Sequence, residues 1–366
     1  MPLRALFLAS YPVRAASTRF RATQFFPALG SYDIECGLSP FLPDHVFADF
    51  YRKGRAARKA LQLALLAARR LVEVARAGRW DVVVVQRESM LVGPPLVEWL
   101  LRRILRKPMV YDYDDAIWVS RPSPTWGSLA ALAKFPAKTA AIVRMANHVI
   151  VCNDYTRDYA LRFRRPGDVT VIPTVVDTNE FKPRPRRNAS TPVIGWIGTH
   201  STAPYLETIR PVLESCARHH RFRLKIVGAG RDFAFHGIET ENKPWRLEDE
   251  VADYQSLDIG LYPVEDDEWG RGKTGFKPVV YMACGVACVC SPVGGVTEFL
   301  VSGKNGLFAS TPGDWEQAID VLLSDRDMRH RLGAAGRETV VNEYSVQRQA
   351  PRLAHILHAV AGERGR

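Results

Sequence analysis

Short apolar runs alternate with longer helical patterns over the first 180 residues of the chain. The runs that read as buried strands are Leu3–Ala9, Trp80–Gln86, Pro108–Asp112 and His148–Cys152. The helical patterns are Tyr51–Gly78, Pro95–Arg106 and Leu129–Ala146, and an earlier helix is expected to start near Thr18 as its N-cap. Strands that alternate with helices in this way predict a doubly wound parallel sheet of the α/β class.

A stretch rich in proline and charge, residues 181–192, interrupts this alternation and reads as a linker. Beyond it, strands are expected near Val193, Leu224, Asp258, Ala287 and Leu307, and an amphipathic helix over Tyr344–Ala361. A chain of 366 residues also exceeds one typical core. We therefore expect two α/β domains, residues 1–180 and 193–342, and a C-terminal helical segment, residues 343–366.

The composition is that of an ordinary globular protein, 46% hydrophobic and 24% charged. The six cysteines include no Cys-x-x-Cys pair, which favours buried free thiols in a reducing cytosol over zinc ligands. Leu3–Ala9 is too short for a convincing secretory signal, and the apolar run near Ala60–Ala68 is too brief to span a bilayer. We expect a cytoplasmic protein, soluble or peripheral at the inner face of the membrane.

The most informative stretch is residues 270–295, which combine two lysines with a glycine-rich turn. Lys273 lies in the turn and Lys277 one helical turn further on, so both ammonium groups could face one small volume. A helix N-terminus flanked by cations suits an anion such as a diphosphate. The run Val286–Cys290 then predicts an inner parallel strand. The loop Pro292–Gly295 follows at its carboxyl end, where open α/β sheets bind ligands.

Further motifs accompany this stretch in a fixed order. They are Val171-Ile-Pro-Thr-Val-Val-Asp177, Val193-Ile-Gly-Trp-Ile-Gly198, Leu224-Lys-Ile-Val-Gly-Ala-Gly230, Leu257-Asp-Ile-Gly-Leu-Tyr-Pro263, Gly294-Gly-Val-Thr-Glu298 and Gly303-Lys-Asn-Gly-Leu-Phe308. Together with residues 270–295, they resemble the donor-binding half of the family 4 (group 1) glycosyltransferases. The likeness is close over residues 171–345 and loose over the first half of the chain.

The resemblance implies the GT-B fold, two Rossmann-like domains of doubly wound parallel sheet facing a cleft, with the C-terminal helix packing back on the first domain. It also implies a retaining glycosyltransferase that moves a sugar from a nucleotide-diphosphate donor, a nucleotide sugar, to a glycan or lipid-linked acceptor. Enzymes of this kind usually stabilise the leaving diphosphate with cations and helix dipoles, so we expect no metal and no other cofactor. The implied mechanism is same-face attack, in which the leaving phosphate accepts the acceptor proton.

The family's usual pair of acids is missing from the aligned positions, which hold Gly272 and Val280. This puts ribose recognition by that route in doubt, although Glu298 or backbone groups could substitute. It also leaves open two alternatives, a non-catalytic GT-B-fold partner in glycan assembly and a nucleotide-sugar epimerase. The expected donor-binding residues are Gly198, Thr199, His200, Lys273, Phe276, Lys277 and Glu298.

The turn Gly198–Thr202 is expected to open a helix at about Ala203 and to aim its amides at a phosphate. Many relatives carry an Arg and a Lys in this turn, whereas this chain has small polar residues and His200. We therefore expect Lys273 and Lys277 to supply the positive charge that binds the diphosphate. The competing readings are solvated surface positions for the lysines, a loop position without a role for His200, and helix capping for Glu298.

In the first half, the segment Tyr111–Trp118 follows a strand with a run of aspartates. Relatives often carry a histidine near the donor sugar in this loop, so Asp114 and Asp115 become candidates for orienting the acceptor or the sugar. Together with Lys273 and Lys277 they form the expected catalytic set. A Mg²⁺-binding Asp-x-Asp, made of the aspartates at 112 and 114, and capping of the next helix are the alternatives.

The segment Ser17-Thr-Arg-Phe-Arg21 resembles a Ser-Thr-Arg-x-Arg stretch that faces the cleft in relatives. Arg19 and Arg21 are accordingly expected on the acceptor side. Arg19 could contact an acceptor phosphate in bidentate fashion. A plain surface charge is the alternative for Arg19.

Residues 52–107 hold fourteen Lys or Arg against four acids, a net charge of +10 beside +11 for the whole chain. We expect no nucleic-acid partner, because no recognised motif or interleaved aromatic pattern accompanies these charges. A solvated helix face and docking on an anionic membrane remain, and we favour docking because many relatives extend lipid-linked glycans. Leu61, Leu65, Leu66 and Val72 could face either a core or the lipid interface.

Overall fold

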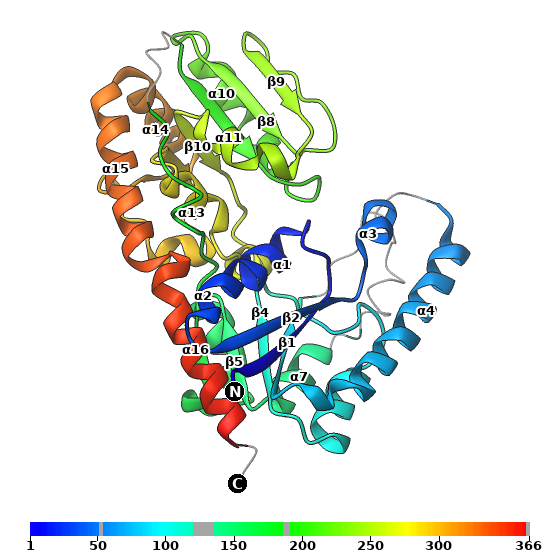
Figure 1. The fold of residues 1–366 in the computed structure, drawn as a ribbon. Helices are drawn as coiled ribbons and strands as arrows, with labels where there is room; N and C mark the ends of the chain where they lie inside the picture. Colours follow the sequence, from blue (N-terminus) through cyan, green and yellow to red (C-terminus); the bar gives the residue numbers. More distant parts are fainter. Residues whose placement is uncertain (51–53, 120–134, 136, 186–190, 364–366) are drawn as a thin grey trace. The chain divides into compact units, whose positions relative to one another are not determined.

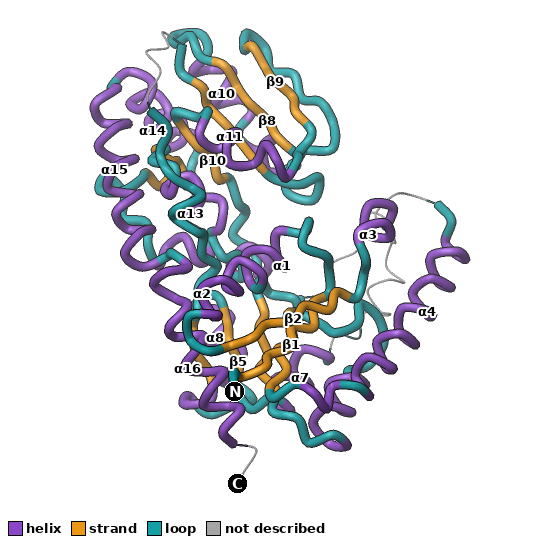
Figure 2. Tube along the Cα trace, in the orientation of Figure 1, coloured by secondary structure: helices purple, strands orange, loops and turns teal. Residues whose placement is uncertain are grey.

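The computed structural model describes residues 1–50, 54–119, 135, 137–185 and 191–363. The chain divides into two compact units: unit 1 comprises residues 1–174 and 349–366, and unit 2 comprises residues 175–348. Each unit is built on one six-stranded sheet with helices beside it, as the ribbon of Figure 1 and the trace of Figure 2 show. All strand pairs within both sheets are parallel, so the predicted α/β class is confirmed.

The sheet of unit 1 has the strand order β2-β1-β3-β4-β5-β6. Its strands are β1 (Leu3–Ala9), β2 (Ile34–Pro40), β3 (Val82–Gln86), β4 (Met109–Tyr113), β5 (His148–Val151) and β6 (Val169–Val171). The α-helices are α1 (Ala16–Arg21), α2 (Phe26–Gly30), α3 (Asp44–Phe50), α4 (Ala56–Ala75), α5 (Leu96–Trp99), α7 (Lys138–Met145), α8 (Asp154–Leu161) and, beyond its first residues, α16 (Val346–Gly362). Shorter turns are η1 (Thr23–Phe25), η2 (Ala77–Arg79), the π-helical η3 (Leu100–Ile104) and η4 (Pro166–Asp168). Strands β3 and β4 are buried along their whole length, as expected for inner strands of a parallel sheet.

The sheet of unit 2 has the strand order β12-β11-β10-β7-β8-β9. Its strands are β7 (Val193–Ile197), β8 (Arg223–Val227), β9 (Glu239–Lys243), β10 (Ile259–Tyr262), β11 (Ala287–Cys290) and β12 (Leu307–Phe308). The helices are α9 (Tyr205–Thr208), α10 (Arg210–Cys216), η5 (Leu247–Asp249), α11 (Glu250–Gln255), α12 (Glu268–Arg271), α13 (Phe276–Ala283), η6 (Gly294–Glu298), α14 (Pro312–Ser324) and α15 (Arg326–Glu343). The carboxyl ends of β7, β10 and β11 lie together at one edge of this sheet, because the three strands are parallel neighbours.

Helix α13 is held against this sheet by a tyrosine and a glycine. A Cβ atom at Gly260 of β10 would lie 2.5 Å from the ring of Tyr281, so only glycine leaves room for that ring. The Tyr281 hydroxyl donates to the carbonyl oxygen of Leu261 and accepts from the amide of Ile197, each at 3.3 Å. These bonds connect α13 to both β10 and β7.

Several predicted elements differ from the observed ones. The expected N-cap, Thr18, is wrong: Thr18 lies inside α1, fully buried, and its hydroxyl donates to the carbonyl oxygen of Tyr11 at 2.8 Å. The predicted helix Pro95–Arg106 is divided between α5 and the π-helical η3. The predicted helices over 51–78 and 129–146 correspond to α4 and α7, and their residues 51–53, 129–134 and 136 lie outside the described part of the chain.

The structure agrees with the expectation of free, mostly buried cysteines. All six cysteines are free thiols, and five of them are buried. In the part of the chain that the structure describes, none of the helices combines the length and the apolar character that crossing a membrane requires.

Candidate functional site

Two glycine-containing turns of unit 2 pack directly on each other. The turn between α12 and α13 contains Lys273 and ends at Gly275, which has φ +69°. The loop after β11 contains Gly294, with φ +72°, where a Cβ atom would lie 2.7 Å from the carbonyl oxygen of Lys273. The amide of the next residue, Gly295, donates to that same oxygen at 2.8 Å. Side chains at these positions would force the two turns apart.

Lys277, the second residue of α13, points its ammonium toward the end of β7. Its Nζ donates to Oγ1 of Thr202 at 3.2 Å and lies 4.4 Å from the ring centre of Trp196. A Cβ atom at Gly198 would lie 2.7 Å from this Nζ, so the ammonium occupies space that glycine leaves empty. The aromatic ring and the hydroxyl hold the cation without neutralising it.

The charge of Lys277 is only partly stabilised by its protein surroundings. Burial, and to a smaller extent the positive charge of Lys273, lower the pKa of Lys277 to about 7. Lys273 itself lies with its Nζ 4.8 Å from the ring centre of Trp269. Two mutually repelling ammonium groups beside an eight-residue helix that starts here form a place where an anion would be stabilised. The sequence analysis identified both lysines but missed Trp196, Trp269 and Thr202.

The turn after β7 differs from its prediction. The following helix, α9, begins at Tyr205 rather than at about Ala203 and is only four residues long. The amides of Thr202 and Ala203 both donate to the carbonyl oxygen of Thr199 at 3.0 Å, so they close the turn instead of pointing at a ligand. Thr199 and His200 are exposed. A Cβ atom at Gly230 would lie 3.0 Å from that of His200, so the loop after β8 passes close to this histidine.

The remaining donor-side candidates occupy different environments. Glu298 is exposed, but it is the last residue of η6, so the expected position near a helix start is wrong. Phe276 is half-buried as the first residue of α13, and its amide donates to Oγ1 of Thr274 at 3.2 Å. Gly272 and Val280, the positions of the missing family acids, are both buried.

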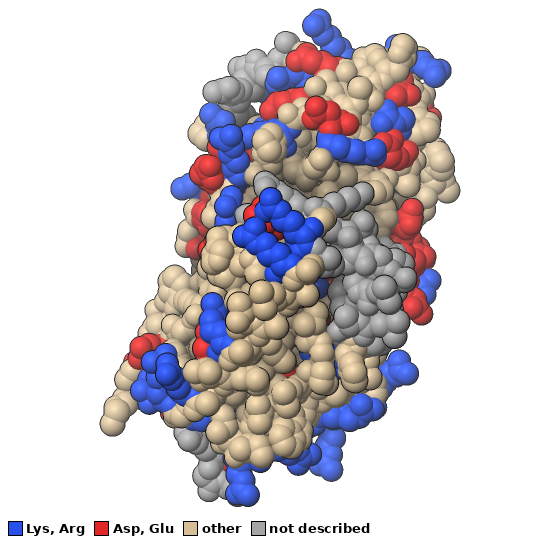
Figure 3. All heavy atoms as spheres, turned by 90° about the vertical axis from the view of Figure 1, so that its right-hand side faces the viewer, with Lys and Arg blue, Asp and Glu red and all other residues tan. Residues whose placement is uncertain are grey.

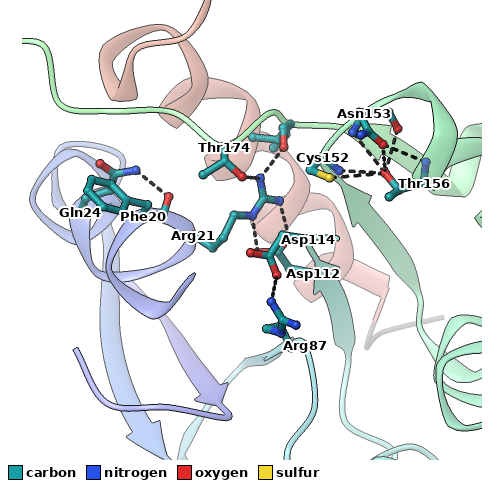
Figure 4. A network of polar contacts seen from close by, with 11 residues as sticks. Phe20, Arg21, Gln24, Arg87, Asp112, Asp114, Cys152, Asn153, Thr156 and Thr174 are labelled. Atoms are coloured by element: carbon teal, nitrogen blue, oxygen red, sulfur yellow. Dashed lines mark hydrogen bonds and ion pairs between the residues drawn. The ribbon is translucent and has the colours of Figure 1, made fainter. Parts of the chain in front are cut away.

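In unit 1, Arg21 and Asp112 form a buried ion pair at the carboxyl end of β4 (Figure 4). Two nitrogens of the Arg21 guanidinium donate to the two carboxylate oxygens of Asp112. A third donates to the carbonyl oxygen of Ile172 at 2.6 Å and approaches Oγ1 of Thr174 at 3.5 Å. Burial raises the pKa of Asp112, and the Arg21 guanidinium opposes that shift. Because Arg21 of α1 makes these bonds to Asp112 of β4 and to residues that follow β6, it connects α1 to the sheet.

Asp114 and Asp115 share one partner, Arg87, which the sequence analysis did not identify. Nη1 of Arg87 lies 2.9 Å from Oδ1 of Asp114 and 3.6 Å from Oδ2 of Asp115. Arg87 and Asp115 both have φ +61°, a left-handed conformation that only a few per cent of such residues adopt. Within the described residues, neither aspartate caps a helix. The carboxylates of the proposed Asp-x-Asp are each already bound to an arginine, which disfavours a Mg²⁺ site there.

Arg19 of α1 is half-buried. Its Nη1 donates to the carbonyl oxygens of Val13 and Arg14, both at 3.3 Å, and its guanidinium lies 4.6 Å from the ring centre of Phe20. Over the described ranges, the structure gathers no group of three His, Cys, Asp or Glu side chains that could hold a metal ion.

The basic stretch 52–107 is not a uniform surface. Lys59, Arg70 and Lys107 are buried and bond to carbonyl or hydroxyl oxygens, and Arg52 and Lys53 lie outside the described residues. The apolar side chains divide as well. Leu66 packs on the core of unit 1. The large exposed ones of α4 are Leu61 at 63%, Leu65 at 63% and Val72 at 52% exposure.

Comparison with known proteins supplies the context for these sites. A model of the Glycosyltransferase Family 4 matches residues 34–180, and a Glycosyl transferase-like model matches residues 207–355. A D-inositol 3-phosphate glycosyltransferase of Corynebacterium jeikeium is 26% identical over 74% of this chain and 71% of its own. A GDP-mannose-dependent alpha-(1-6)-phosphatidylinositol monomannoside mannosyltransferase of Mycobacterium tuberculosis is 22% identical over 78% of this chain and 85% of its own.

Solved structures agree on the fold. Sucrose-phosphate synthase of Thermosynechococcus elongatus superposes with a TM-score of 0.73 at 15% identity, over 99% of this chain and all of its own. HepE of Anabaena, in complex with UDP and glucose, superposes with a TM-score of 0.70 at 16% identity, over 98% of this chain and 100% of its own. The two parallel sheets therefore form the predicted GT-B fold.

Replacing Arg21 by Met should destabilise unit 1 strongly, because the carboxylate of Asp112 would remain buried without its counter-charge. We expect the free energy of unfolding to fall by about 3–5 kcal/mol, and a double variant Arg21→Met/Asp112→Leu to recover much of that loss. Denaturant titration of each variant measures this. The matched control is Arg19→Met, which should cost less than about 1 kcal/mol. Equal losses for Arg19→Met and Arg21→Met would contradict the structural role of Arg21.

The affinity for a nucleoside diphosphate should decrease with rising pH. The ammonium of Lys277 has a pKa of about 7 without ligand, and a bound anion favours the charged form. Above pH 7, binding therefore requires Lys277 to take up a proton. The affinity should then fall by up to about tenfold for each further pH unit. The second phosphate pKa is about 6, so the ligand charge hardly changes over this range. Calorimetry between pH 7.5 and 9 should show this slope for the wild type and for the exposed-lysine control Lys304→Met. The Lys277→Met variant should bind the diphosphate weakly, and its affinity should not depend on pH in this way. If Lys277→Met kept the pH dependence of the wild type, Lys277 would not be the group that takes up the proton.

Proposed function

Because the chain belongs to the family 4 (group 1) glycosyltransferases, we propose that it transfers a sugar from a nucleotide-diphosphate donor to a glycan or lipid-linked acceptor, with retention at the anomeric carbon and without a metal ion. The observation that supports this most directly is the ammonium of Lys277, held between Trp196 and Thr202 at the carboxyl edge of the unit 2 sheet. A transferase of this kind needs cations where the leaving diphosphate gains charge.

Each donor-side residue then has a distinct role. Lys277 and Lys273 stabilise the leaving diphosphate, and the N-terminus of α13 adds its dipole. The adjoining loop at Gly294 lies against the backbone of Lys273, in a space that only glycine leaves open. We assign Gly198, Thr199 and His200, in the turn after β7, and Phe276, next to Lys277 in α13, to further contacts with the donor. Glu298 would take the place of an acid that binds sugar or ribose hydroxyls.

On the acceptor side, we assign Asp114 and Asp115 to orienting an acceptor hydroxyl or the sugar, held in place by Arg87. Arg19 is the residue on this side that would meet a phosphate of the acceptor. Arg21 acts as a positioning residue through its bonds to Asp112. The names of two relatives describe inositol-based acceptors, which fits an acceptor that combines hydroxyls with a phosphate.

A second function has specific support. A GT-B protein that binds a nucleotide sugar without transferring it would account for the buried Val280 and Gly272 at the family's acid positions. An epimerase has less support, since it needs an acid and a base facing one sugar carbon, and the aspartates at 114 and 115 are both paired with Arg87.

The test is a binding panel followed by turnover. UDP, GDP, ADP, dTDP and CMP are titrated with and without Mg²⁺, and the matching nucleotide sugar is then supplied with candidate acceptors. We expect one diphosphate to bind without Mg²⁺ and Lys273→Met and Lys277→Met to lose about tenfold or more in affinity and in turnover, as expected for charge-assisted bonds to a phosphate. Lys304→Met is the control. Binding without transfer would favour the non-catalytic function, and binding by neither diphosphate nor sugar would contradict both.

We also propose that α4 docks unit 1 on an anionic membrane at the cytoplasmic face. The exposed positions Ala57, Leu61, Ala64, Leu65, Ala68, Val72 and Ala75 follow helical spacing along one face, and we call them the α4 stripe. Three exposed arginines, Arg58, Arg69 and Arg76, follow one flank of that stripe. Figure 3 looks onto this side and shows a broad area without charged side chains, with Lys and Arg at its border. Apolar surface beside a row of cations matches the interface of an anionic bilayer.

Vesicle sedimentation tests this docking. The wild type should bind phosphatidylglycerol vesicles and bind phosphatidylcholine vesicles far more weakly. Leu61→Ser/Leu65→Ser should reduce binding to the anionic vesicles at least about tenfold, because roughly 1.5–3 kcal/mol is lost for each large apolar side chain kept out of the bilayer. The control is Leu247→Ser/Val301→Ser, two exposed apolar residues of unit 2. Unchanged binding of the α4 variant would contradict docking through this stripe.

A further inference from the structure

Four arginines surround a cavity of about 260 Å³ in unit 1, and none of the proposed donor-binding or acceptor-side residues lines it. The arginines are Arg102, Arg103, Arg144 and Arg164, and the two carboxylates of the lining are Asp168 and Glu363. The cavity lies where β4 and β5 begin, whereas Asp112 and its partners lie where β4 ends. Ligands of open α/β sheets occupy the carboxyl edge, so this amino-edge cavity is separate from the acceptor side.

Arg102 is held by neutral carbonyl oxygens, whereas Arg164 is paired with one carboxylate of the lining. Arg102 donates from Nε to the carbonyl oxygen of Met145 and from Nη1 to that of Lys107, both at 2.8 Å. Nη2 of Arg164 donates to the carbonyl oxygen of Asn147 at 2.9 Å and lies 2.9 Å from a carboxylate oxygen of Asp168. The arginines outnumber the carboxylates of the lining by two. Positive charge is thus concentrated and only half compensated.

The chain already places one anion of its own in this cavity. Glu363, the residue after α16, accepts a hydrogen bond from Nδ2 of Asn147 at 2.8 Å. Burial lowers the pKa of Arg102, the neighbouring Arg103 and Arg164 lower it further, and the carboxylate of Glu363 opposes them. The side chain of Glu363 is exposed and follows α16 rather than a strand, so it can leave without disturbing the sheet.

Donor capacity is left for another ligand. Nε of Arg164 is buried and has no hydrogen-bond partner in the described structure. Arg103 and Arg144 are exposed at the rim, and the guanidinium of Arg144 lies 4.3 Å from the ring centre of Phe163, which restricts its plane. Guanidinium groups bind phosphate through paired, directional hydrogen bonds. An excess of two positive charges matches a phosphate dianion better than the single charge of a carboxylate.

We propose that this arginine cavity is a binding site for a phosphate group, which competes with the carboxylate of Glu363. The phosphate comes either free in solution or on the headgroup of a lipid. When it binds, Glu363 is displaced, and the end of α16 loses its hydrogen bond to Asn147. The cavity thereby couples a phosphate signal to the C-terminal helix and does not depend on which sugar the chain transfers.

Calorimetry with inorganic phosphate tests the site in the full chain. All variants are made in a Lys273→Met/Lys277→Met background, so that the lysines of unit 2 contribute nothing. Arg103→Ala/Arg144→Ala should weaken phosphate binding about tenfold or more, since charge-assisted hydrogen bonds are lost. Glu363→Gln should strengthen it several-fold, because the competing charge is removed. The control Arg106→Ala/Arg165→Ala removes two exposed arginines that do not line the cavity and should leave the affinity unchanged.

The opposite responses of the two cavity variants make the outcome decisive. Phosphate binding that is unaffected by Arg103→Ala/Arg144→Ala would overturn the site, and unaffected binding in Glu363→Gln would overturn the competition. The source is identified with phosphatidic acid vesicles. Sedimentation is measured in the Leu61→Ser/Leu65→Ser background. If co-sedimentation of the protein with these vesicles is lost in Arg103→Ala/Arg144→Ala, the phosphate is that of a lipid. Binding of inorganic phosphate alone assigns the free ion.

Discussion

The arrangement around Lys277 in unit 2 depends on glycines that let its half-buried ammonium and its helix approach the sheet closely. The ammonium of Lys277 reaches the ring of Trp196 because Gly198 has no Cβ atom. Helix α13 packs closely on the sheet because Gly260 leaves room for the ring of Tyr281. A side chain at either glycine would displace the lysine or the helix that carries it. These contacts cost conformational entropy at the glycines, and they fix the lysine before any ligand binds.

The two units treat their buried charges differently. In unit 1 the carboxylates at the end of β4 are paired with arginines, Asp112 with Arg21, and Asp114 and Asp115 with Arg87. Such pairs contribute little net stability after desolvation, but they hold their members in one geometry. In unit 2 the cation meets an aromatic ring and a hydroxyl, which orient it without cancelling its charge. The ion pairs of unit 1 hold side chains in place, whereas the lysine of unit 2 keeps a positive charge that can attract an anion.

The sequence predicted what is local and missed what is distant. Inner strands such as β3 were readable, because residues buried on both faces form continuous apolar runs. The edge strands β2, β6 and β9 were missed; β9, for example, reads Glu-Thr-Glu-Asn-Lys and is half open to solvent. In the site, the glycine turn revealed Lys277, but its contact with Thr202 spans 75 positions of the sequence. No local pattern indicates a partner that only the fold brings near.

The valine at position 280, where the resemblance leads us to expect an acid, is physically linked to the lowered pKa of Lys277. The two positions are three residues apart in α13, so their side chains lie on neighbouring parts of one helical face. A glutamate at 280 would stabilise the ammonium and raise its pKa, whereas a buried valine adds to its desolvation. In the described structure no carboxylate pairs with Lys277, so an anion bound there would supply its counter-charge. If Lys277 binds the donor as we propose, the valine at 280 makes the charge of the lysine more dependent on the diphosphate.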